Sequence, residues 1–229
     1  MKNLIIIPAY NEAGNIERTI KDIKEHAPSF DYITVNDCSR DETLEICREN
    51  HFNYLNLPVN LGIGGAVQTG YRYAYFHGYD TAVQFDGDGQ HDASYLEQML
   101  KTLTEEKCNM VIGSRFIEKE GFQSNRLRRF GIRYFTGLIR FLTGKVITDP
   151  TSGLRMSDRT IISKFAFDYP KDYPEPESVV TIIMEGANVK EVPVMMRERL
   201  EGKSSINIKA GAYYMIKVSF AIILARLKG

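Results

Sequence analysis

Residues 83–92 read VQFDGDGQHD, and this stretch decides how the rest of the chain can be understood. An apolar run with Val83 and Phe85 ends abruptly in two aspartates, Asp86 and Asp88, that alternate with glycines. The pattern predicts a buried strand with a turn at its carboxyl end, where open α/β sheets bind ligands. Two crowded carboxylates repel each other unless a cation lies between them, and hard oxygen ligands suit Mg²⁺ or Mn²⁺. A lone Asp-x-Asp is equally compatible with a solvated acidic turn, so the rest of the chain has to decide.

Short apolar segments alternate with amphipathic segments on both sides of this stretch. Strands are expected at residues 4–7, 32–35, 54–57, 81–85 and 110–112. Helices are expected at residues 15–26, 66–76 and 94–105, with another after Asp41 that buries Leu44 and Cys47. This alternation predicts one α/β domain with a mostly parallel sheet and right-handed crossovers.

The composition excludes several classes of protein. With 229 residues, 43% hydrophobic and 25% charged, the chain can bury a core and is not a disordered one. Its formal net charge of +0 argues against a general nucleic-acid-binding protein. Cys38, Cys47 and Cys108 lack metal-ligand spacing, and their odd number argues against a disulfide framework, which fits a reducing, cytosolic compartment. Since no apolar run reaches the roughly 18 residues of a spanning helix, we expect a protein that is soluble or lies on a membrane without crossing it.

Polar residues follow three of the predicted strands at their carboxyl ends. Residues 10–12 (Tyr-Asn-Glu) follow the first strand, Asp37 and Ser39 the second, and Asp86 and Asp88 the fourth. These ends meet at one edge of a parallel sheet, which predicts a nucleotide pocket there. A dinucleotide-binding dehydrogenase would need its glycine triplet after the first strand. The glycine-rich turn of this chain comes two strands later, which argues against that class.

Six motifs occur in order along nearly the whole chain. They are PAYNE (residues 8–12), NDCSRD (36–41), NLGIGGAVQTG (60–70), DGDGQHD (86–92), GSR (113–115) and DPTSGLR (149–155). Together they resemble the inverting glycosyltransferases of family 2. The likeness is greatest to the branch that transfers a sugar to a polyprenyl phosphate, typified by dolichyl-phosphate mannose synthase. Two features depart from the family pattern: Asn36-Asp37 replaces the usual acidic pair, and the transmembrane helices that many members carry do not follow.

The resemblance implies a GT-A-type single domain, with a Rossmann-like sheet flanked by helices and with amphipathic C-terminal helices at the membrane interface. Within residues 1–229, it implies a nucleotide-sugar-binding half (1–115), an acceptor-side half (116–211) and an amphipathic C-terminal helix (212–229). The implied donor-binding residues are Pro8, Ala9, Tyr10, Glu12, Asp37, Asp86 and Asp88. The implied ligands of the Mg²⁺ or Mn²⁺ cofactor are Asp86, Asp88 and Gln90. His91 is more simply explained as a hydrogen-bonded loop histidine than as a ligand.

The segment between Glu120 and Asp149 is basic and contains no acidic residue. Its charged residues are Arg126, Arg128, Arg129, Arg133, Arg140 and Lys145. Apolar residues recur among them at roughly helical spacing: Phe130, Tyr134, Phe135, Leu138, Ile139, Phe141 and Leu142. A basic amphipathic helix is typical of a membrane interface with anionic head groups. A surface helix that packs on the core is the simpler alternative.

A polyprenyl phosphate brings its own ionised nucleophile, so no side chain has to remove a proton before attack. The enzyme has to hold two phosphorylated substrates together against their repulsion, a task that suits arginine. The candidates for binding the acceptor phosphate are Arg115, Arg129, Arg133 and Arg155, and those for catalysis are Asp88, Arg115 and Arg133. A basic loop with Arg199, Lys203 and Ser204 resembles the family's closing loop over the donor pyrophosphate. A solvated charged hairpin is its alternative.

The predicted reaction makes a lipid-linked sugar for cell-envelope glycan or protein glycosylation. The expected donor is UDP-glucose, UDP-GlcNAc or GDP-mannose, and the expected acceptor is undecaprenyl or dolichyl phosphate. Glu175 and Glu177 lie where related enzymes with hydroxyl acceptors keep a base. Transfer to a hydroxyl of a growing surface polysaccharide is therefore an alternative. A non-catalytic nucleotide-sugar-binding scaffold is a second one.

The last segment, residues 212–227, is apolar along one helical face. Such a face can lie on a membrane, pack against a second copy of the chain or dock a small membrane partner protein. We therefore expect a peripheral protein on the cytoplasmic face of the membrane. We further expect a homo-oligomer with no nucleic-acid partner.

Overall fold

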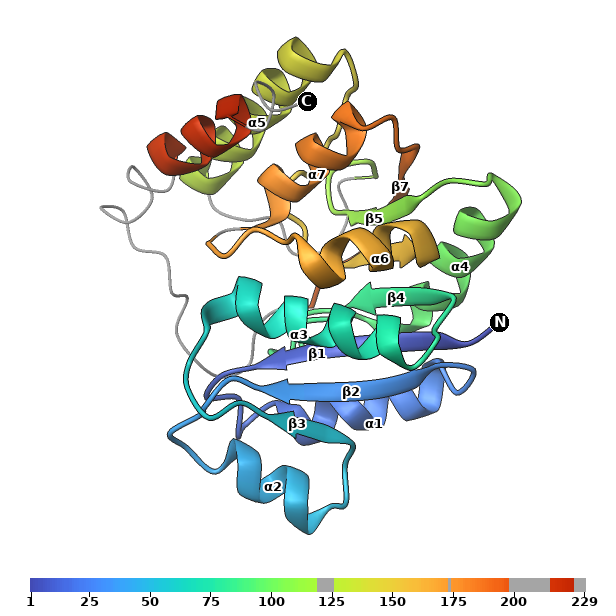
Figure 1. Cartoon of the computed structure of the whole chain (residues 1–229), viewed down its shortest axis with the longest axis vertical. Helices are drawn as coiled ribbons and strands as arrows, with labels where there is room; N and C mark the ends of the chain where they lie inside the picture. Colours follow the sequence, from blue (N-terminus) through green and yellow to red (C-terminus); the bar gives the residue numbers. More distant parts are fainter. Residues whose placement is uncertain (119–125, 173, 198–214, 225–229) are drawn as a thin grey trace.

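A seven-stranded sheet in the order β3-β2-β1-β4-β6-β5-β7 runs through the computed structural model, which describes residues 1–118, 126–172, 174–197 and 215–224 (Figure 1). The strands are β1 (Asn3–Ala9), β2 (Asp31–Asn36), β3 (Tyr54–Asn56), β4 (Thr81–Gln84), β5 (Met110–Ser114), β6 (Arg155–Asp158) and β7 (Val189–Pro193). β6 is antiparallel to both of its neighbours, β4 and β5, and the other pairs are parallel. The five predicted strands and the mostly parallel sheet are thus confirmed.

Helices cover both faces of the sheet (Figure 1). They are α1 (Ile16–His26), α2 (Thr43–Glu49), α3 (Gly62–Phe76), η1 (Ala93–Tyr95), α4 (Leu96–Glu105), α5 (Arg126–Thr143), α6 (Arg159–Phe167) and α7 (Pro174–Met184). A further helical segment comprises residues 215–224. The prediction that the third helix begins at residue 66 was wrong, because Gly64 already lies in its first turn. A Cβ at Gly64 would overlap the carbonyl oxygens of Pro170 and Lys171, so the glycine permits a close approach of two backbones.

β1 lies inside the sheet, and its alternating side chains build the two cores. Leu4 and Ile6 belong to the core under α3 and α6, whereas Ile5 and Ile7 belong to the core under α1 and α4. All four are fully buried. A strand that is apolar on both faces has to be central in a parallel sheet. This strand therefore fixes the edge at which the polar loops emerge.

α5 and the segment 215–224 lie side by side at one end of the molecule (Figure 1). Phe135 of α5 and Val218 of the segment are buried in the same core. The hydroxyls of Tyr134 and Ser219 are 3.0 Å apart and join the two helices. In the part of the chain that the structure describes, no helix is both long and apolar enough to cross a bilayer.

Two helical glycines provide a matched test of this packing. Gly70→Ala in α3 should lower the free energy of unfolding by about 1–3 kcal/mol, because the new Cβ would overlap the side chain of Ile6. Gly137→Ala in α5 meets no atom within 4 Å and should instead raise it, by up to about 1 kcal/mol, through higher helix propensity. Urea unfolding followed by circular dichroism measures both. Equal effects of the two substitutions would contradict the close contact of α3 with β1.

Candidate active site

The loops after β1 and β2 are joined by hydrogen bonds at the carboxyl edge of the sheet. The backbone N of Asn11 donates to Oγ of Ser39 (3.0 Å), and the backbone N of Arg40 donates to Oδ1 of Asn11 (2.8 Å). The backbone N of Glu12 donates to Oγ1 of Thr43 (2.9 Å). Asn11 has a φ of 57°, a left-handed conformation that asparagine tolerates. The predicted meeting of the first two strand ends is confirmed.

The loop after β4 lies against the end of β1. A Cβ on Gly87 would be 3.1 Å from the carbonyl oxygen of Pro8 and 3.7 Å from Cβ of Ala9. Thr19 of α1 also donates its hydroxyl to the carbonyl oxygen of Gly87 (3.3 Å). The third predicted strand end therefore joins the first two at the same edge.

The remaining predicted donor residues line this edge with different exposure. Asp37 is buried, and its Oδ1 accepts a hydrogen bond from the backbone N of Leu61 at the start of α3 (2.7 Å). Tyr10 is exposed. Oε2 of Glu12 accepts from Nδ2 of Asn15 (2.8 Å). Asp37 is thus held between β2 and α3, while the ring of Tyr10 remains accessible to a ligand.

The turn at residues 86–92, here the 86–92 loop, keeps its shape through local hydrogen bonds. The backbone N of Asp86 donates to Nδ1 of His91 (3.0 Å), and the backbone N of Gln90 donates to Oδ1 of Asp88 (3.0 Å). His91 is buried and packs edge-on against Phe85, with 5.2 Å between ring centroids. Because Nδ1 accepts, Nε2 carries the proton and faces the Asp86 carboxylate at 3.7 Å. These contacts support the interpretation of His91 as a loop histidine.

Asp86 and Asp88 offer carboxylate oxygens, hard ligands of the kind that a divalent ion such as Mg²⁺ prefers. Mg²⁺ is commonly held by one or two carboxylates together with substrate phosphates and water. Within the described ranges, no group of three or more His, Cys, Asp or Glu residues could hold a metal ion. A Cβ on Gly153 would lie 2.6 Å from Oδ2 of Asp86. Gly153 therefore leaves the space that this carboxylate occupies.

Arg115 is buried in a pair with Asp149. Nε and Nη2 of Arg115 donate to Oδ2 and Oδ1 of Asp149 at 2.6 and 2.7 Å, a bidentate geometry. Glu191 of β7 accepts in turn from the backbone N of Thr148 and of Asp149. The position of Arg115 thus differs from the one expected for an arginine that binds the acceptor phosphate. Its guanidinium fixes the loop before β6 to the end of β5.

Arg155 is 1% exposed, and the protein's own oxygens surround its guanidinium. Nε donates to the carbonyl oxygen of Ser152 and Nη2 to that of Pro150, both at 2.7 Å. Nη1 donates to the carbonyl oxygen of Glu175 (2.6 Å) and to Oγ of Ser178 (3.1 Å). These bonds tie the loop before β6 to the first turn of α7. Here too the position differs from the one expected, because an enclosed guanidinium organises this loop rather than an exposed phosphate site.

Sequence reasoning missed Gln84, the last residue of β4, which lies between two carboxyl groups. Its Nε2 donates to Oδ1 of Asp86 (3.2 Å), and its side chain also hydrogen-bonds the carboxyl group of Glu175. Burial raises the pKa of Glu175 above its usual value, although the positive charge of Arg155 opposes this shift. The available signal was a polar side chain between the apolar residues Val83 and Phe85.

The predicted acceptor-side residues lie on other parts of the chain. Arg129 and Arg133 are one turn apart on α5, with Arg129 half-buried and Arg133 exposed. Their contact with the acceptor phosphate stays a prediction. Arg199, Lys203 and Ser204, the predicted closing loop, lie outside the described residues.

Residues 4–165 match the family model described as Glycosyl transferase family 2. The chain belongs to this family of glycosyltransferases. This family 2 enzyme is 31% identical over 214 residues to a UDP-N-acetylglucosamine–dolichyl-phosphate N-acetylglucosaminyltransferase of Methanococcus voltae, covering 83% of each chain. It is 27% identical over 216 residues to an undecaprenyl-phosphate mannosyltransferase of Micrococcus luteus, covering 90% of this chain and 88% of the relative.

A solved structure shares the fold of this family 2 glycosyltransferase. The glucosyl-3-phosphoglycerate synthase of Mycobacterium tuberculosis, crystallised with Mn²⁺ and UDP-glucose, superposes with a TM-score of 0.76 at 18% identity. The match covers 98% of this chain and 78% of the synthase. The predicted GT-A-type fold is confirmed.

The buried pair of Arg115 and Asp149 can be tested against an exposed pair. Asp149→Asn removes the charge that compensates an enclosed guanidinium and should lower the free energy of unfolding by about 3–5 kcal/mol. Asp172→Asn, which breaks the exposed pair of Asp172 with Lys217 (2.7 Å), should change it by less than about 1 kcal/mol. Urea denaturation of both variants provides the comparison. A wild-type stability of Asp149→Asn would contradict a structural role for this pair.

Proposed function

We propose that this enzyme transfers a sugar, with inversion, from a nucleoside diphosphate sugar to the phosphate of a polyprenyl phosphate. The observation that carries the proposal is the pair Asp86 and Asp88 at the edge where the loops after β1, β2 and β4 meet. The relatives from Methanococcus voltae and Micrococcus luteus are named for transfer to dolichyl phosphate and undecaprenyl phosphate, which supports the acceptor class.

The donor and its metal occupy the sheet edge in this proposal. The nucleoside lies along Pro8, Ala9, Tyr10, Glu12 and Asp37. Asp86, Asp88 and Gln90 would hold a Mg²⁺ or Mn²⁺ ion at the diphosphate. When bound, this ion supplies neutralisation of the charge that develops on the leaving diphosphate.

The acceptor attacks from the side of α5. Its phosphate oxygen forms a bond to C1 of the sugar while the bond from C1 to the diphosphate oxygen breaks, and that electron pair leaves with the nucleoside diphosphate. Arg129 and Arg133 hold the acceptor phosphate close to the donor against charge repulsion. Arg115 and Arg155 act indirectly, because they shape the loop that carries Gly153 beneath Asp86.

A hydroxyl acceptor would require a general base near C1 of the donor. Of the two glutamates that the sequence suggested, Glu175 lies close enough to Asp86 for their charges to interact. Its hydrogen bond with Gln84 and its proximity to Arg155 favour a structural carboxyl behind Asp86. A phosphate acceptor needs no such base. The arrangement of Glu175 therefore supports the polyprenyl phosphate over the sugar hydroxyl.

The metal assignment predicts a strong loss of activity without loss of the fold. Asp88→Asn should lower transfer of labelled sugar to undecaprenyl phosphate by roughly a hundredfold or more. The reason is that the ion would be bound less well and would no longer neutralise the charge that develops on the leaving diphosphate. EDTA should abolish transfer, and added Mg²⁺ or Mn²⁺ should restore it. A chloroform-soluble product, measured with UDP-glucose, UDP-GlcNAc and GDP-mannose, provides the assay. Full turnover in chelator would contradict the metal site, and a product only with sugar hydroxyls would contradict the acceptor.

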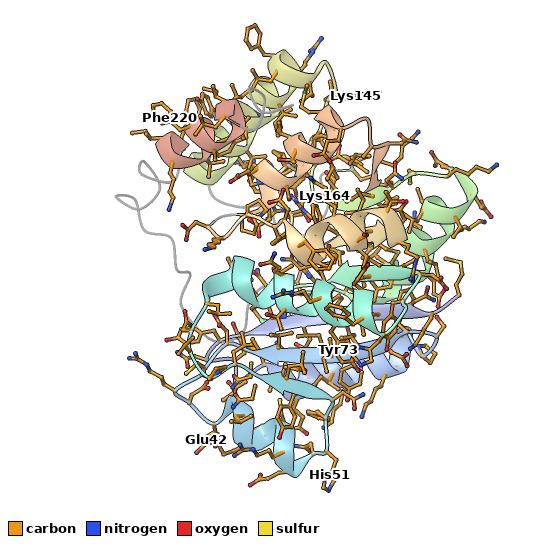
Figure 2. All side chains as sticks on the ribbon, viewed as in Figure 1. Glu42, His51, Tyr73, Lys145, Lys164 and Phe220 are labelled. Carbon is orange, nitrogen blue, oxygen red and sulfur yellow. The ribbon has the colours of Figure 1, made fainter. Side chains whose placement is uncertain are left out.

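We further propose that the enzyme is peripheral on the cytoplasmic face of a membrane and binds it through α5 and the segment 215–224. Both helices have an exposed apolar stripe opposite their buried one. The exposed residues, here the apolar face, are Phe130, Tyr134, Phe141, Ile216, Phe220, Ile223 and Leu224. Phe220 and Lys145 project at this end of the molecule (Figure 2).

The apolar face is continuous across the two helices and is flanked by positive charge. Tyr134, Ile216 and Phe220 line one open groove of about 310 Å³ between them. At about 100° per residue, Arg133 and Arg140 fall on one flank of the apolar stripe of α5. Both arginines are exposed. An apolar surface flanked by basic residues is typical of proteins that bind the interface of an anionic bilayer.

Only part of the apolar set of α5 is available for lipid contact in this proposal. Phe135 and Ile139 are fully buried in the core, although the sequence placed them on the membrane-facing helix without distinction. Phe141 is 85% exposed. The outer stripe, not the whole apolar set, is therefore the surface to alter.

Vesicle binding tests this surface. Phe141→Ser with Phe220→Ser should weaken binding to anionic vesicles by about tenfold or more, because both rings lose apolar burial. Phe76→Ser is the matched control, since Phe76 is 68% exposed on α3 and lies outside the apolar face. High salt should weaken the charge-dependent part for every variant. Wild-type binding by the double variant, or no vesicle binding at all by the wild type, would contradict a self-sufficient membrane contact.

A further inference from the structure

Arg197 bridges two elements that flank the 86–92 loop. Its Nη2 lies 3.0 Å from Oδ1 of Asp22 on α1 and 2.9 Å from Oδ2 of Asp92 at the end of the loop. Oδ2 of Asp22 accepts from the backbone N of Ala93 (3.0 Å). One arginine and one aspartate thus clamp the point where the loop passes into η1.

The backbone of Arg197 is also paired with the middle of the loop. Its N donates to the carbonyl oxygen of Gln90 (2.9 Å), and Nε2 of Gln90 reaches the carbonyl oxygen of Arg197 (3.4 Å). The backbone N of Gln90 in turn donates to Oδ1 of Asp88. A short chain of hydrogen bonds therefore runs from Arg197 through Gln90 to the Asp88 carboxylate.

The 86–92 loop has a reason to need such a support. It contains Gly87 and Gly89, and Gly89 has a φ of 73°, so its backbone is intrinsically adaptable. The start of the loop is held by β4 and by the bond from Asp86 to His91. The contacts of Arg197 hold the other half, where Gln90 lies.

The ion pairs of Arg197 are too exposed to matter greatly for the stability of the whole protein. The side chain of Arg197 is 42% exposed, that of Asp92 25% and that of Asp22 10%. Exposed ion pairs contribute little to global stability. These ion pairs can still fix the conformation of a glycine-rich loop, even though they contribute little to the free energy of unfolding. Arg197 can therefore be altered without unfolding the enzyme.

We propose that Arg197 is a positioning residue that holds Gln90, and through it Asp88, in the geometry that receives the divalent ion. This inference rests on the proposed function, in which the 86–92 loop binds the ion of the donor diphosphate. No part of it requires Arg197 to touch the substrate. Loss of the side-chain contacts of Arg197 with Asp22 and Asp92 should loosen the 86–92 loop and weaken the binding of the ion. The packing of the core should not change.

The test compares Arg197→Met with a control that breaks a similar bridge elsewhere. Lys164 on α6 also bridges two carboxylates, Asp168 (3.7 Å) and Glu185 (2.7 Å), beside the opposite core, so Lys164→Met is the matched variant. Mn²⁺ is titrated into each protein with UDP present and followed by electron paramagnetic resonance. Hydrogen exchange of residues 86–93 is measured in the metal-free proteins, together with thermal unfolding.

Arg197→Met should weaken Mn²⁺ binding roughly tenfold, as loss of a supporting contact around a metal commonly does. It should speed exchange at the amides of Gln90 and Arg197 and leave the unfolding temperature near that of the wild type. Arg197→Lys should restore part of the affinity, and Lys164→Met should match the wild type in Mn²⁺ binding and in exchange. Wild-type Mn²⁺ affinity in Arg197→Met would overturn the proposal. If the wild type itself bound no Mn²⁺, the metal assignment would fail, and exchange at Gln90 alone would decide whether Arg197 orders the loop.

Discussion

The buried guanidinium of Arg155 is the constraint on which the loop before β6 and the start of α7 depend. A charge with almost no access to water has to be surrounded by oxygen atoms, or its burial would be prohibitively costly. The carbonyl oxygens of Ser152, Pro150 and Glu175 meet this requirement only if the loop before β6 curls round the side chain and α7 begins beside it. That curl places Gly153 under the Asp86 carboxylate. The geometry of the donor edge thus depends on a residue that lies behind it.

The antiparallel strand β6 makes this arrangement possible. It enters the sheet between β4 and β5, so the loop before it arrives at the same edge where β4 ends. A purely parallel insertion would have placed that loop at the opposite edge. The pair of Arg115 and Asp149 then joins the loop to the end of β5. The loop before β6 therefore reaches the ends of β4 and β5 because one strand of the sheet is antiparallel to its neighbours.

The helices α5 and α1 each pack one face into the core and present another face outside it. One stripe of α5 packs into the core through Ile132, Phe135 and Ile139, and the opposite stripe is exposed. α1 likewise buries Ile16, Ile20 and Ile23, while a neighbouring face carries Thr19 to the 86–92 loop and Asp22 to the start of η1. In each case helical periodicity separates the residues that hold the helix in place from those that act beyond the core. Function is therefore built onto elements whose position packing already fixes.

The sequence alone determined the parts of this protein that depend on local pattern. Apolar runs, turns and amphipathic spacing were enough to predict five strands, the parallel character of the sheet and the edge at which Asp37, Asp86 and Asp88 gather. The motifs were enough to predict the family. The tertiary structure decided what depends on contacts between distant residues. The sequence marked Arg115 and Arg155 as candidates for binding a phosphate, but only the structure shows that Asp149 and the carbonyl groups of the loop before β6 enclose their guanidinium groups. Phe135 and Phe141 fall on different faces of α5, one buried and the other exposed, and only the packing of α5 shows which face is turned to the core. Periodicity shows which residues share one face of a helix, but the elements packed against the helix decide whether that face is buried or exposed.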